Sequence, residues 1–385
     1  MKIAIVGGGP SGLFLSILLK RKSPELDIAV HEQNAAQATF GFGVVLADTG
    51  LSHIRNADPE VCEALVQSMR FNDRHTIVTR ETAITMRRPG LGGGAIPRIR
   101  LLGILQSQAR ALGIAVHYES RIADFDALDS DLVVGADGVN SHVRDSDAAG
   151  FDVRRHDLTN HFAWYGVDKV FSNPALVFRK AQGGYFVAHY YPYSDTMSTF
   201  VAECDHQTWL DLGMQDMDDE ERQKLFERVF AAELEGSGLL SNHSVWRQFP
   251  VVRAHNWHVG NRVLIGDALN SAHFSIGSGT RIAMEDAIAL ARAIVAHQDD
   301  IPAALSRYVN ERRPQKQKLI GASEASFNWY EKIREWIDAY EPQEFVLRFM
   351  TRTGRVGMER LHEQYPDLVR GFEAAGLSLD AEGVR

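Results

Sequence analysis

A glycine cluster near the amino terminus is the first feature of the sequence that could bind a ligand. Gly7, Gly9 and Gly12 fit the pattern G-x-G-x-x-G. The first glycine permits a tight turn, the second lets a diphosphate approach the backbone, and the third allows close packing of helix against strand. Glu32 stands about twenty residues further on, where a carboxylate accepts hydrogen bonds from a ribose hydroxyl. These residues predict a dinucleotide site, but they do not distinguish FAD from NAD.

Short apolar runs on both sides of the glycines indicate the elements that hold them. Residues 2–6 (KIAIV) are typical of a strand, residues 11–22 of a helix, and residues 28–31 of a second strand. This order opens a doubly wound parallel sheet. The apolar run 11–19 (SGLFLSILL) is too short to span a bilayer, and its basic residues follow it. We therefore expect a buried helix, and neither a signal peptide nor a membrane span.

Two later segments each place an acidic turn after an apolar strand. Residues 131–144 read DLVVGADGVNSHVR, and residues 262–280 read RVLIGDALNSAHFSIGSGT. Either segment alone could be an ordinary turn at the end of a strand. Their order after the glycine pattern is more specific for a nucleotide cofactor. The residues that we expect to bind it in these segments are Asp137, Gly138, Asp267, Gly277 and Gly279.

With these three motifs in order, the chain resembles the single-component FAD-dependent aromatic hydroxylases, which share the fold of para-hydroxybenzoate hydroxylase. The resemblance implies that the first motif binds the ADP half of FAD, that Asp137 and Gly138 lie near its diphosphate, and that Asp267 lies on the ribityl chain. It also implies that the helix beginning near Gly279 directs its positive end at the flavin pyrimidine. Arg98, between Pro97 and Ile99, matches a family arginine close to FAD.

The same resemblance implies a reaction. NADH or NADPH reduces FAD, O2 adds to the reduced ring as a C4a-hydroperoxide, and an electron-rich arene attacks the distal oxygen. We therefore expect a phenol, an aniline or an indole as substrate, and neither a metal site nor a Ser/His/Asp triad. Flavin-dependent halogenases share the first motif but carry a Trp-x-Trp-x-Ile-Pro motif, which this sequence lacks. A non-enzymatic flavin-binding protein stays open as an alternative.

Further segments narrow the resemblance to one subgroup. It contains hydroxylases of aromatic acyl-CoA thioesters, such as salicylyl-CoA and 2-aminobenzoyl-CoA, and a hydroxylase of a tryptophan-derived intermediate in violacein biosynthesis. An aryl-CoA thioester is the substrate that we expect, and an indole or another free aromatic is the alternative. From the chain length we expect simple hydroxylation, without the reductase module of the aminobenzoyl enzymes. The segments concerned are 40–45 (FGFGVV), 164–171 (WYGVDKVF), 198–200 (STF) and 273–280 (HFSIGSGT).

Residues 162–203 alternate and are rich in Tyr, Phe and Val, which predicts an antiparallel sheet carrying one face of a substrate site. His189, Tyr191 and Tyr193 share one face of an extended strand, and the resemblance places this sheet over the flavin. His189 and His273 are candidate proton acceptors, because imidazole titrates with a pKa of about 6.5. A structural role for either histidine is equally open. The residues that we expect to contact the substrate are Tyr191, Tyr193 and Phe274.

These observations predict an α/β fold with a Rossmann-like FAD-binding domain, an inserted antiparallel-sheet substrate domain and a helical carboxy-terminal region. The helical region is expected because residues 303–336 place apolar and charged residues at helical spacing. The expected bounds are 1–72, 98–160 and 250–300 for the FAD-binding domain, 73–97 and 161–249 for the substrate domain, and 301–385 for the helical region.

Composition limits the partners. The chain has 385 residues and a net charge of −9, so nucleic-acid binding, which needs a basic field, is not expected. Two cysteines, Cys62 and Cys204, form neither a metal pattern nor a disulfide framework, which favours a cytoplasmic enzyme. We expect no membrane partner, and a homodimer is compatible with the sequence.

A CoA tail would need cations for its phosphates. The available basic residues are Arg87, Arg88, Arg312, Arg313, Lys316 and Lys318, although such runs are more often solvated helix faces. Trp329 and Trp336 offer rings for an adenine, or they pack in the core.

Overall fold

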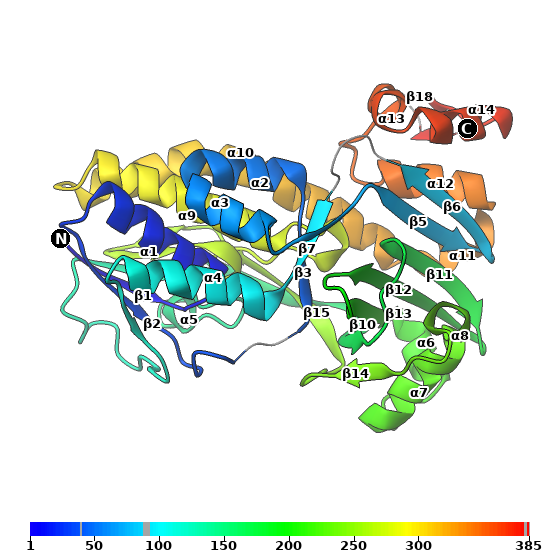
Figure 1. Ribbon diagram of the computed structural model, residues 1–385, viewed down its shortest axis with the longest axis horizontal. Helices are drawn as coiled ribbons and strands as arrows, with labels where there is room; N and C mark the ends of the chain where they lie inside the picture. The colour runs from blue at the N-terminus through cyan, green and yellow to red at the C-terminus, as the bar shows by residue number, and fades with distance from the viewer. Residues whose placement is uncertain (39–40, 88–92, 381–382, 385) are drawn as a thin grey trace.

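The computed structural model describes residues 1–38, 41–87, 93–380 and 383–384. Phe40 and Arg88, which entered the sequence arguments, lie outside these residues. Figure 1 shows α1, α4 and α9 at one end of the molecule, and the strands β10 to β13 with α6, α7 and α8 at the other. Within the described ranges, no helix is long and apolar enough to cross a membrane.

A six-stranded sheet forms the first end. Its order is β16-β17-β9-β1-β2-β8; all neighbours are parallel except the hairpin of β16 with β17. Helix α1 (Pro10–Lys22) lies between α4 (Arg98–Ala111) and α9 (Gly279–Ala296). Residues 11–19 of α1 are all buried, which agrees with the predicted buried helix. The strand bounds are β1 (Lys2–Val6), β2 (Asp27–His31), β8 (Ala115–His117), β9 (Leu132–Gly135), β16 (His258–Val259) and β17 (Arg262–Leu264).

The second large sheet has the order β14-β10-β13-β12-β11-β5-β6, and β15 also pairs with β10. Its neighbours are antiparallel except β5 and β11, which are parallel. Alternation divides β12 between two cores: Phe186 and Ala188 face α7, whereas Tyr185 and Val187 face the carboxy-terminal helices. The strand bounds are β5 (Arg74–Thr79), β6 (Thr82–Arg87), β10 (Val153–Val167), β11 (Ala175–Ala181), β12 (Gly184–Pro192), β13 (Ser198–Cys204), β14 (Leu239–Ser241) and β15 (Arg247–Ala254).

Three short helices cover the first face of this sheet, namely α6 (His206–Asp211), α7 (Asp219–Val229) and α8 (Ala231–Leu234). A third sheet, of order β3-β7-β4, lies next to α4, because β7 runs directly into that helix. Its strands are β3 (Gly43–Leu46), β4 (Arg70–Asn72) and β7 (Gly93–Pro97), and α2 (Asp48–Ala57) and α3 (Pro59–Val66) stand between β3 and β4 in the chain.

The strands β10 and β15 pair along most of their length. Both continue through the predicted domain boundaries near 160 and 250, so the two units share a pair of strands there. The boundaries themselves stay predictions.

The carboxy-terminal region is helical, as predicted. Helix α10 (Ile301–Tyr330) reaches from the core of the first end, where Leu305 is buried, to the core under the second sheet, where Tyr330 is buried. The expected continuous helix 303–336 is interrupted after α10, where the Glu331 carboxylate accepts the backbone N–H groups of Thr159 and Asn160. The later helices are α11 (Ile333–Ala339), α12 (Pro342–Thr351), α13 (Met358–Gln364) and α14 (Pro366–Ala374). The architecture confirms the predicted α/β fold class.

Candidate active site

A cavity of about 1410 Å³ is lined by residues of the three sheets described above and of the carboxy-terminal helices. Sites for one small ligand usually measure roughly 300–1,000 Å³. The volume is therefore large enough for a nucleotide cofactor and a second ligand together.

The three glycines of the first motif serve three different purposes. Gly7 has a φ of +112°, and a β-carbon there would lie 2.3 Å from the carbonyl oxygen of Ala136. A β-carbon at Gly12 would lie 2.1 Å from the carbonyl oxygen of Gly7, so this glycine allows α1 to pack on the turn. A β-carbon at Gly9 would meet no protein atom within 4 Å, and Gly9 lines the cavity. Gly9 therefore leaves space for a ligand, whereas Gly12 leaves space for the protein itself.

The carboxylate of Glu32 is fixed at the edge of the cavity. It accepts the backbone N–H of Gly8 at 2.8 Å on one oxygen, and the backbone and side-chain N–H groups of Asn34 at 2.8 and 2.7 Å on the other. Each carboxylate oxygen keeps acceptor capacity. This geometry fits the ribose hydroxyl that the sequence analysis assigned to Glu32.

Asp137 lines the same cavity, and one of its two carboxylate oxygens has no hydrogen-bond partner among the described residues. One of its oxygens accepts the backbone N–H groups of His142 and Val143 at 2.7 and 3.2 Å, and the other, Oδ1, is buried without a hydrogen-bond partner in the described structure. Burial raises the pKa of this carboxyl group. Unpaired buried polar atoms usually have a ligand or water as partner. The following residue, Gly138, has a φ of +78° and also lines the cavity.

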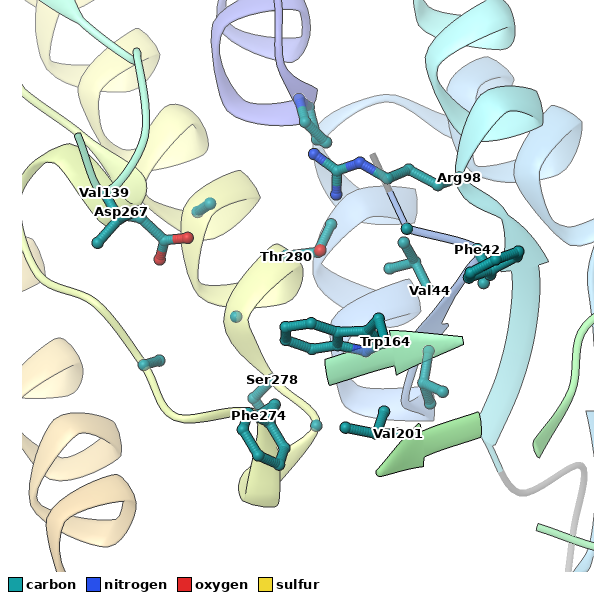
Figure 2. A pocket seen from close by; sticks show the side chains of 18 of the residues that line it. Phe42, Val44, Arg98, Val139, Trp164, Val201, Asp267, Phe274, Ser278 and Thr280 are labelled. Carbon is teal, nitrogen blue, oxygen red and sulfur yellow. The ribbon is translucent and has the colours of Figure 1, made fainter. Parts of the chain in front are cut away.

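Arg98 and Asp267 point into this space from two different segments (Figure 2). The Asp267 side chain is open to the cavity although it lies deep inside the molecule, and burial raises its pKa while the charges of Lys316 and Arg98 oppose that rise. Burial lowers the pKa of Arg98. A cation and an acidic group are thus available on the cavity wall.

The amino terminus of α9 completes the cofactor end. Gly277, Ser278, Gly279 and Thr280 line the cavity, and no side chain caps this helix. The first N–H groups of a helix are free to bind a ligand, and the helix dipole adds partial positive charge. The open space at Gly9, the unpaired oxygen of Asp137 and this helix end together fit a dinucleotide.

A buried ion cluster holds the turn that carries Asp267. Asp286 accepts the backbone N–H of Gly266 at 2.9 Å and pairs with Arg312 and Lys316, whose side chains are buried. Arg312 and Lys316 therefore stabilise the fold through these buried ion pairs. This corrects the idea that they bind a CoA tail.

Two further candidates for the CoA tail, Arg313 and Arg87, have structural partners as well. Arg313 donates to the carbonyl oxygen of His255 at 3.0 Å, and Arg87 pairs with Asp73 at 2.7 Å. Trp329 packs against Phe345 in the core under the second sheet, and Trp336 stacks beside it. The two tryptophans are core residues.

Aromatic side chains form the other end of the cavity, which we call the aromatic chamber; it is defined by Phe162, Trp164, His189 and Phe274. The ring centroid of Phe274 lies 4.7 Å from that of Phe162, 5.4 Å from that of Trp164 and 5.4 Å from that of His189. Figure 2 shows Trp164 between the start of α9 and Val44. Arg247 lies over the rings of Phe162 and Trp164, at 5.6 and 5.8 Å from their centroids.

The three residues that we predicted on one face of β12 do not all line the cavity. His189 and Tyr191 line the cavity, and the hydroxyl of Tyr191 donates to the carbonyl oxygen of Gly43 at 2.8 Å. Burial raises the pKa of Tyr191 to about 12. Tyr193 does not line the cavity; β12 ends at Pro192, and the Tyr193 ring packs on Gly43 instead. The substrate contact expected for Tyr193 has no support from its position.

His273 lies behind the cavity wall, although its neighbour Phe274 lines it. The side chain is 3% exposed, and Nδ1 is 2.8 Å from the hydroxyl of Ser275. Burial, with the charges of His189 and Arg352, lowers the pKa of His273 to about 3. A proton acceptor must reach the substrate. His273 does not reach the cavity, so we do not carry it into the proposed mechanism.

Three cavity residues escaped the sequence analysis as site residues, namely His75, Arg247 and Arg352. Burial lowers the pKa of His75 to about 4. Arg352 donates to Ser326, to the carbonyl oxygen of Phe349 and to that of Ser275 at 2.7–3.0 Å, and no described carboxylate lies within 4.0 Å of it. No local motif marks these positions, because they converge from β5, β15 and the end of α12.

A nucleotide-binding end and an adjoining aromatic chamber in one cavity define a flavoprotein with a second site for an aromatic ligand. Comparison with known proteins agrees. Residues 107–323 match the FAD binding domain family. Over 383 residues, 97% of this chain and 74% of the relative, the chain is 38% identical to salicyloyl-CoA 5-hydroxylase of a Streptomyces species. The chain belongs to the FAD-dependent aromatic monooxygenases.

Two further relatives have comparable similarity. The chain is 35% identical to protodeoxyviolaceinate monooxygenase of Chromobacterium violaceum, over 91% of this chain and 94% of that protein. It is 32% identical to 3-hydroxy-4-methyl-anthranilyl-[aryl-carrier protein] 5-monooxygenase of Streptosporangium sibiricum, over 86% and 90%. The resemblance to this subgroup, inferred from sequence, is confirmed.

The fold has close counterparts among solved structures. Tetrameric 2-methyl-3-hydroxypyridine-5-carboxylic acid oxygenase superposes with a TM-score of 0.73 at 19% identity, over 91% of this chain and 95% of that one. The cofactor is FAD, and the family uses NADH or NADPH as electron donor. No group of three or more His, Cys, Asp or Glu in the described ranges is arranged to hold a metal ion.

Proposed function

We propose that this monooxygenase hydroxylates a phenol or aniline ring that reaches the site as an aryl-CoA thioester, such as salicyloyl-CoA or 2-aminobenzoyl-CoA. Two of the three relatives above are named for aromatic acyl groups held by CoA or by a carrier protein. Reduced by NADH or NADPH, bound FAD supplies activated oxygen from O2.

The remaining work falls to residues of this chain. Gly7, Gly9, Glu32 and Asp137 would hold the nucleotide half of the cofactor, and Arg98, Asp267 and the start of α9, at Gly277 and Gly279, its flavin half. The walls of the aromatic chamber would orient the ring and exclude water, which keeps activated oxygen from being wasted. His189 would accept the proton of a ring hydroxyl, with Tyr191 and Phe274 beside the substrate.

The observation that carries the thioester is a continuation of the cavity beyond the chamber. His75, Leu176, Arg74 and Tyr365 line the cavity as well as His189, and Arg74 is exposed. The Arg74 guanidinium has no ion-pair partner among the described residues. A ring bound in the chamber could therefore stay attached to a long substituent that passes the Arg74 guanidinium, as the CoA part of a thioester would.

One assay tests this proposal. Purified enzyme with FAD is given salicyloyl-CoA or 2-aminobenzoyl-CoA, and separately the free acids, tryptophan and indole, and substrate-dependent NADH and NADPH oxidation is measured with product mass. We expect the thioesters alone to stimulate oxidation and to gain one oxygen. Stimulation only by free aromatics would overturn the thioester.

A pair of variants adds a structural control. Arg74→Gln should raise KM for the thioester about tenfold, which is the loss expected for a charge-assisted hydrogen bond of roughly 1.5 kcal/mol. Arg307→Gln, on α10, paired with Glu311 and absent from the cavity wall, should leave KM unchanged.

A free aromatic acid, including an indole-derived one, is the second candidate. The positive charge of Arg352 on the cavity wall, with no described carboxylate beside it, would suit a substrate carboxylate. The match to protodeoxyviolaceinate monooxygenase extends over 94% of that protein. The assay above separates the two candidates.

A further inference from the structure

His189 has a carboxylate partner that the sequence analysis did not foresee. Its Nε2 lies 3.0 Å from Oε2 of Glu203, on the neighbouring strand β13. The two side chains are 8% and 1% exposed. The other oxygen of Glu203 accepts the side-chain N–H of Asn160 at 3.1 Å, and Asn160 also donates to the carbonyl oxygen of Tyr330.

These bonds determine which nitrogen of His189 carries the proton. An ionised carboxylate only accepts hydrogen bonds, so Nε2 is the donor, and in the neutral imidazole that a proton acceptor requires, Nδ1 holds the lone pair. Nδ1 has no hydrogen-bond partner in the described structure, and His189 lines the cavity. The free acceptor is therefore available to a ligand in the aromatic chamber.

The other charged and titratable groups around His189 come from four elements. His75 on β5 and His273 before the 3-10 helix at Phe274–Ile276 are neutral at working pH, since burial lowers their pKa values to about 4 and 3. Tyr330 of α10 stacks on the His189 ring at 5.4 Å, and burial raises its pKa. Arg352, after α12, contributes a positive charge. Glu203 is therefore the negatively charged group among these neighbours of His189.

We propose that Glu203 is a positioning residue, which holds His189 with Nδ1 toward the substrate and stabilises the imidazolium that forms there. The inference rests on the proposed function, which places the reacting ring in the chamber. In the step, the O–H bond of a phenolic substrate breaks and its electron pair stays on the substrate oxygen. The proton forms a new N–H bond at Nδ1, so the substrate becomes more electron-rich. Such a proton transfer typically contributes 10²- to 10⁴-fold in rate.

The variant Glu203→Gln gives a sharp prediction. Asn160 already donates to one side-chain oxygen, so the introduced glutamine keeps its oxygen there and turns its NH2 toward His189. Nε2 then becomes the acceptor, and the proton moves to Nδ1. The wrong tautomer faces the chamber, although the side chains keep their shape.

The tautomer is measured in the FAD-loaded enzyme with 15N-labelled histidine, and the His189 signals are assigned by their loss in His189→Gln. We expect protonated Nε2 in the wild type, protonated Nδ1 in Glu203→Gln and recovery of protonated Nε2 in Glu203→Asp. Glu324→Gln, which removes a carboxylate of α10 that pairs with Arg253, is the control and should leave His189 unchanged. Protonated Nδ1 in the wild type, or no change in Glu203→Gln, would overturn the proposal. No substrate is needed, so this result is decided even if the thioesters prove inactive.

Kinetics separate positioning from a structural role. Glu203→Gln should lower kcat for salicyloyl-CoA about 10²-fold, at the low end of general-base effects, with KM little changed. A ring-fluorinated salicyloyl-CoA, whose hydroxyl ionises more readily, should show a much smaller loss. A purely structural defect would lower both rates equally, and equal losses would reject the proposal.

Discussion

The carboxylate of Asp286 accepts the backbone N–H of Gly266 at 2.9 Å, at the turn that presents Asp267 to the cavity. Lys316 and Arg312 from α10 neutralise the same carboxylate, and all three side chains are buried. This buried cluster therefore ties the cofactor end of the cavity to the long carboxy-terminal helix.

Asp286→Asn should weaken both fold and cofactor binding. The substitution leaves the buried Lys316 without its ion-pair partner, while Arg312 keeps Glu285, and removing one partner of a buried pair typically costs about 3–5 kcal/mol. We expect the free energy of unfolding in urea to fall by that amount and FAD affinity to fall with it. Glu311→Gln, which breaks an exposed pair with Arg307, should cost no more than about 1 kcal/mol. Equal stabilities of the two variants would contradict this account.

Gly9→Ala and Gly12→Ala should fail in different ways. Gly9 has a φ of −75°, which alanine adopts readily, and its β-carbon would extend into the open cavity. The apoprotein should therefore keep its stability while FAD affinity falls at least about tenfold, or roughly 1.4 kcal/mol. At Gly12 the new carbon meets backbone at 2.1 Å. There we expect a loss of stability of about 1–3 kcal/mol, typical of overpacking.

Fluorescence titration of FAD into the apoproteins and urea unfolding measure the two effects separately. If Gly9→Ala bound FAD like the wild type, the first motif would not contact the diphosphate as proposed.

The part of the site that sequence could predict is local. A strand, a tight glycine turn and a helix start all fall within residues 2–22, and period-two alternation placed His189 on the face of β12 that it shares with Val187, toward the carboxy-terminal helices. Tyr193 departs from this alternation because the strand has ended. In the irregular segment around His273 and Phe274 no period indicates which side chain faces the cavity.

Long-range pairing was not predictable in this way. Lys316 and Arg312 resembled a solvated basic run, because their partner Asp286 stands on another helix. Glu203 stands opposite Val187 in the strand register and is brought diagonally beside His189 only by the pairing of β12 with β13. Arg352 joins the same cavity from the end of α12. These long-range contacts follow from the topology of the fold, so neither composition nor residue spacing predicts them.

His273 should make the protein less stable in mild acid. The pKa of His273 is about 3 in the folded protein and about 6.5 in the unfolded chain. Between these pH values the unfolded chain therefore binds a proton at this residue that the folded protein does not bind. The stabilisation is complete above pH 6.5 and is lost as the pH falls toward 3. We expect this group to contribute a slope of up to about 1.4 kcal/mol per pH unit in that window.

His273→Asn tests this slope, because asparagine can replace the acceptor that caps Ser275 but does not titrate. Urea unfolding between pH 7 and pH 4 should show a flatter profile than the wild type. The exposed His156→Asn is the matched control and should keep the wild-type slope. A His273→Asn profile as steep as that of the control would show that His273 is not the group responsible.

Arg352 should determine how tightly the substrate is held. Three of its donors are used by Ser326, Phe349 and Ser275, and the remaining N–H groups are available on the cavity wall. Hydrogen bonds from charged groups contribute about 1.5–3 kcal/mol. Arg352→Gln should therefore raise KM at least about tenfold, with a smaller change in kcat and no change in FAD affinity. Arg352→Lys keeps the positive charge, so its KM should lie between that of the wild type and that of Arg352→Gln. Arg348→Gln, in α12 but paired with Glu344 and absent from the cavity wall, is the control. Steady-state product formation measures all three variants. Equal KM values for Arg352→Gln and Arg348→Gln would mean that the substrate does not touch this guanidinium, and a larger effect on a free acid than on its thioester would favour the free acid as substrate.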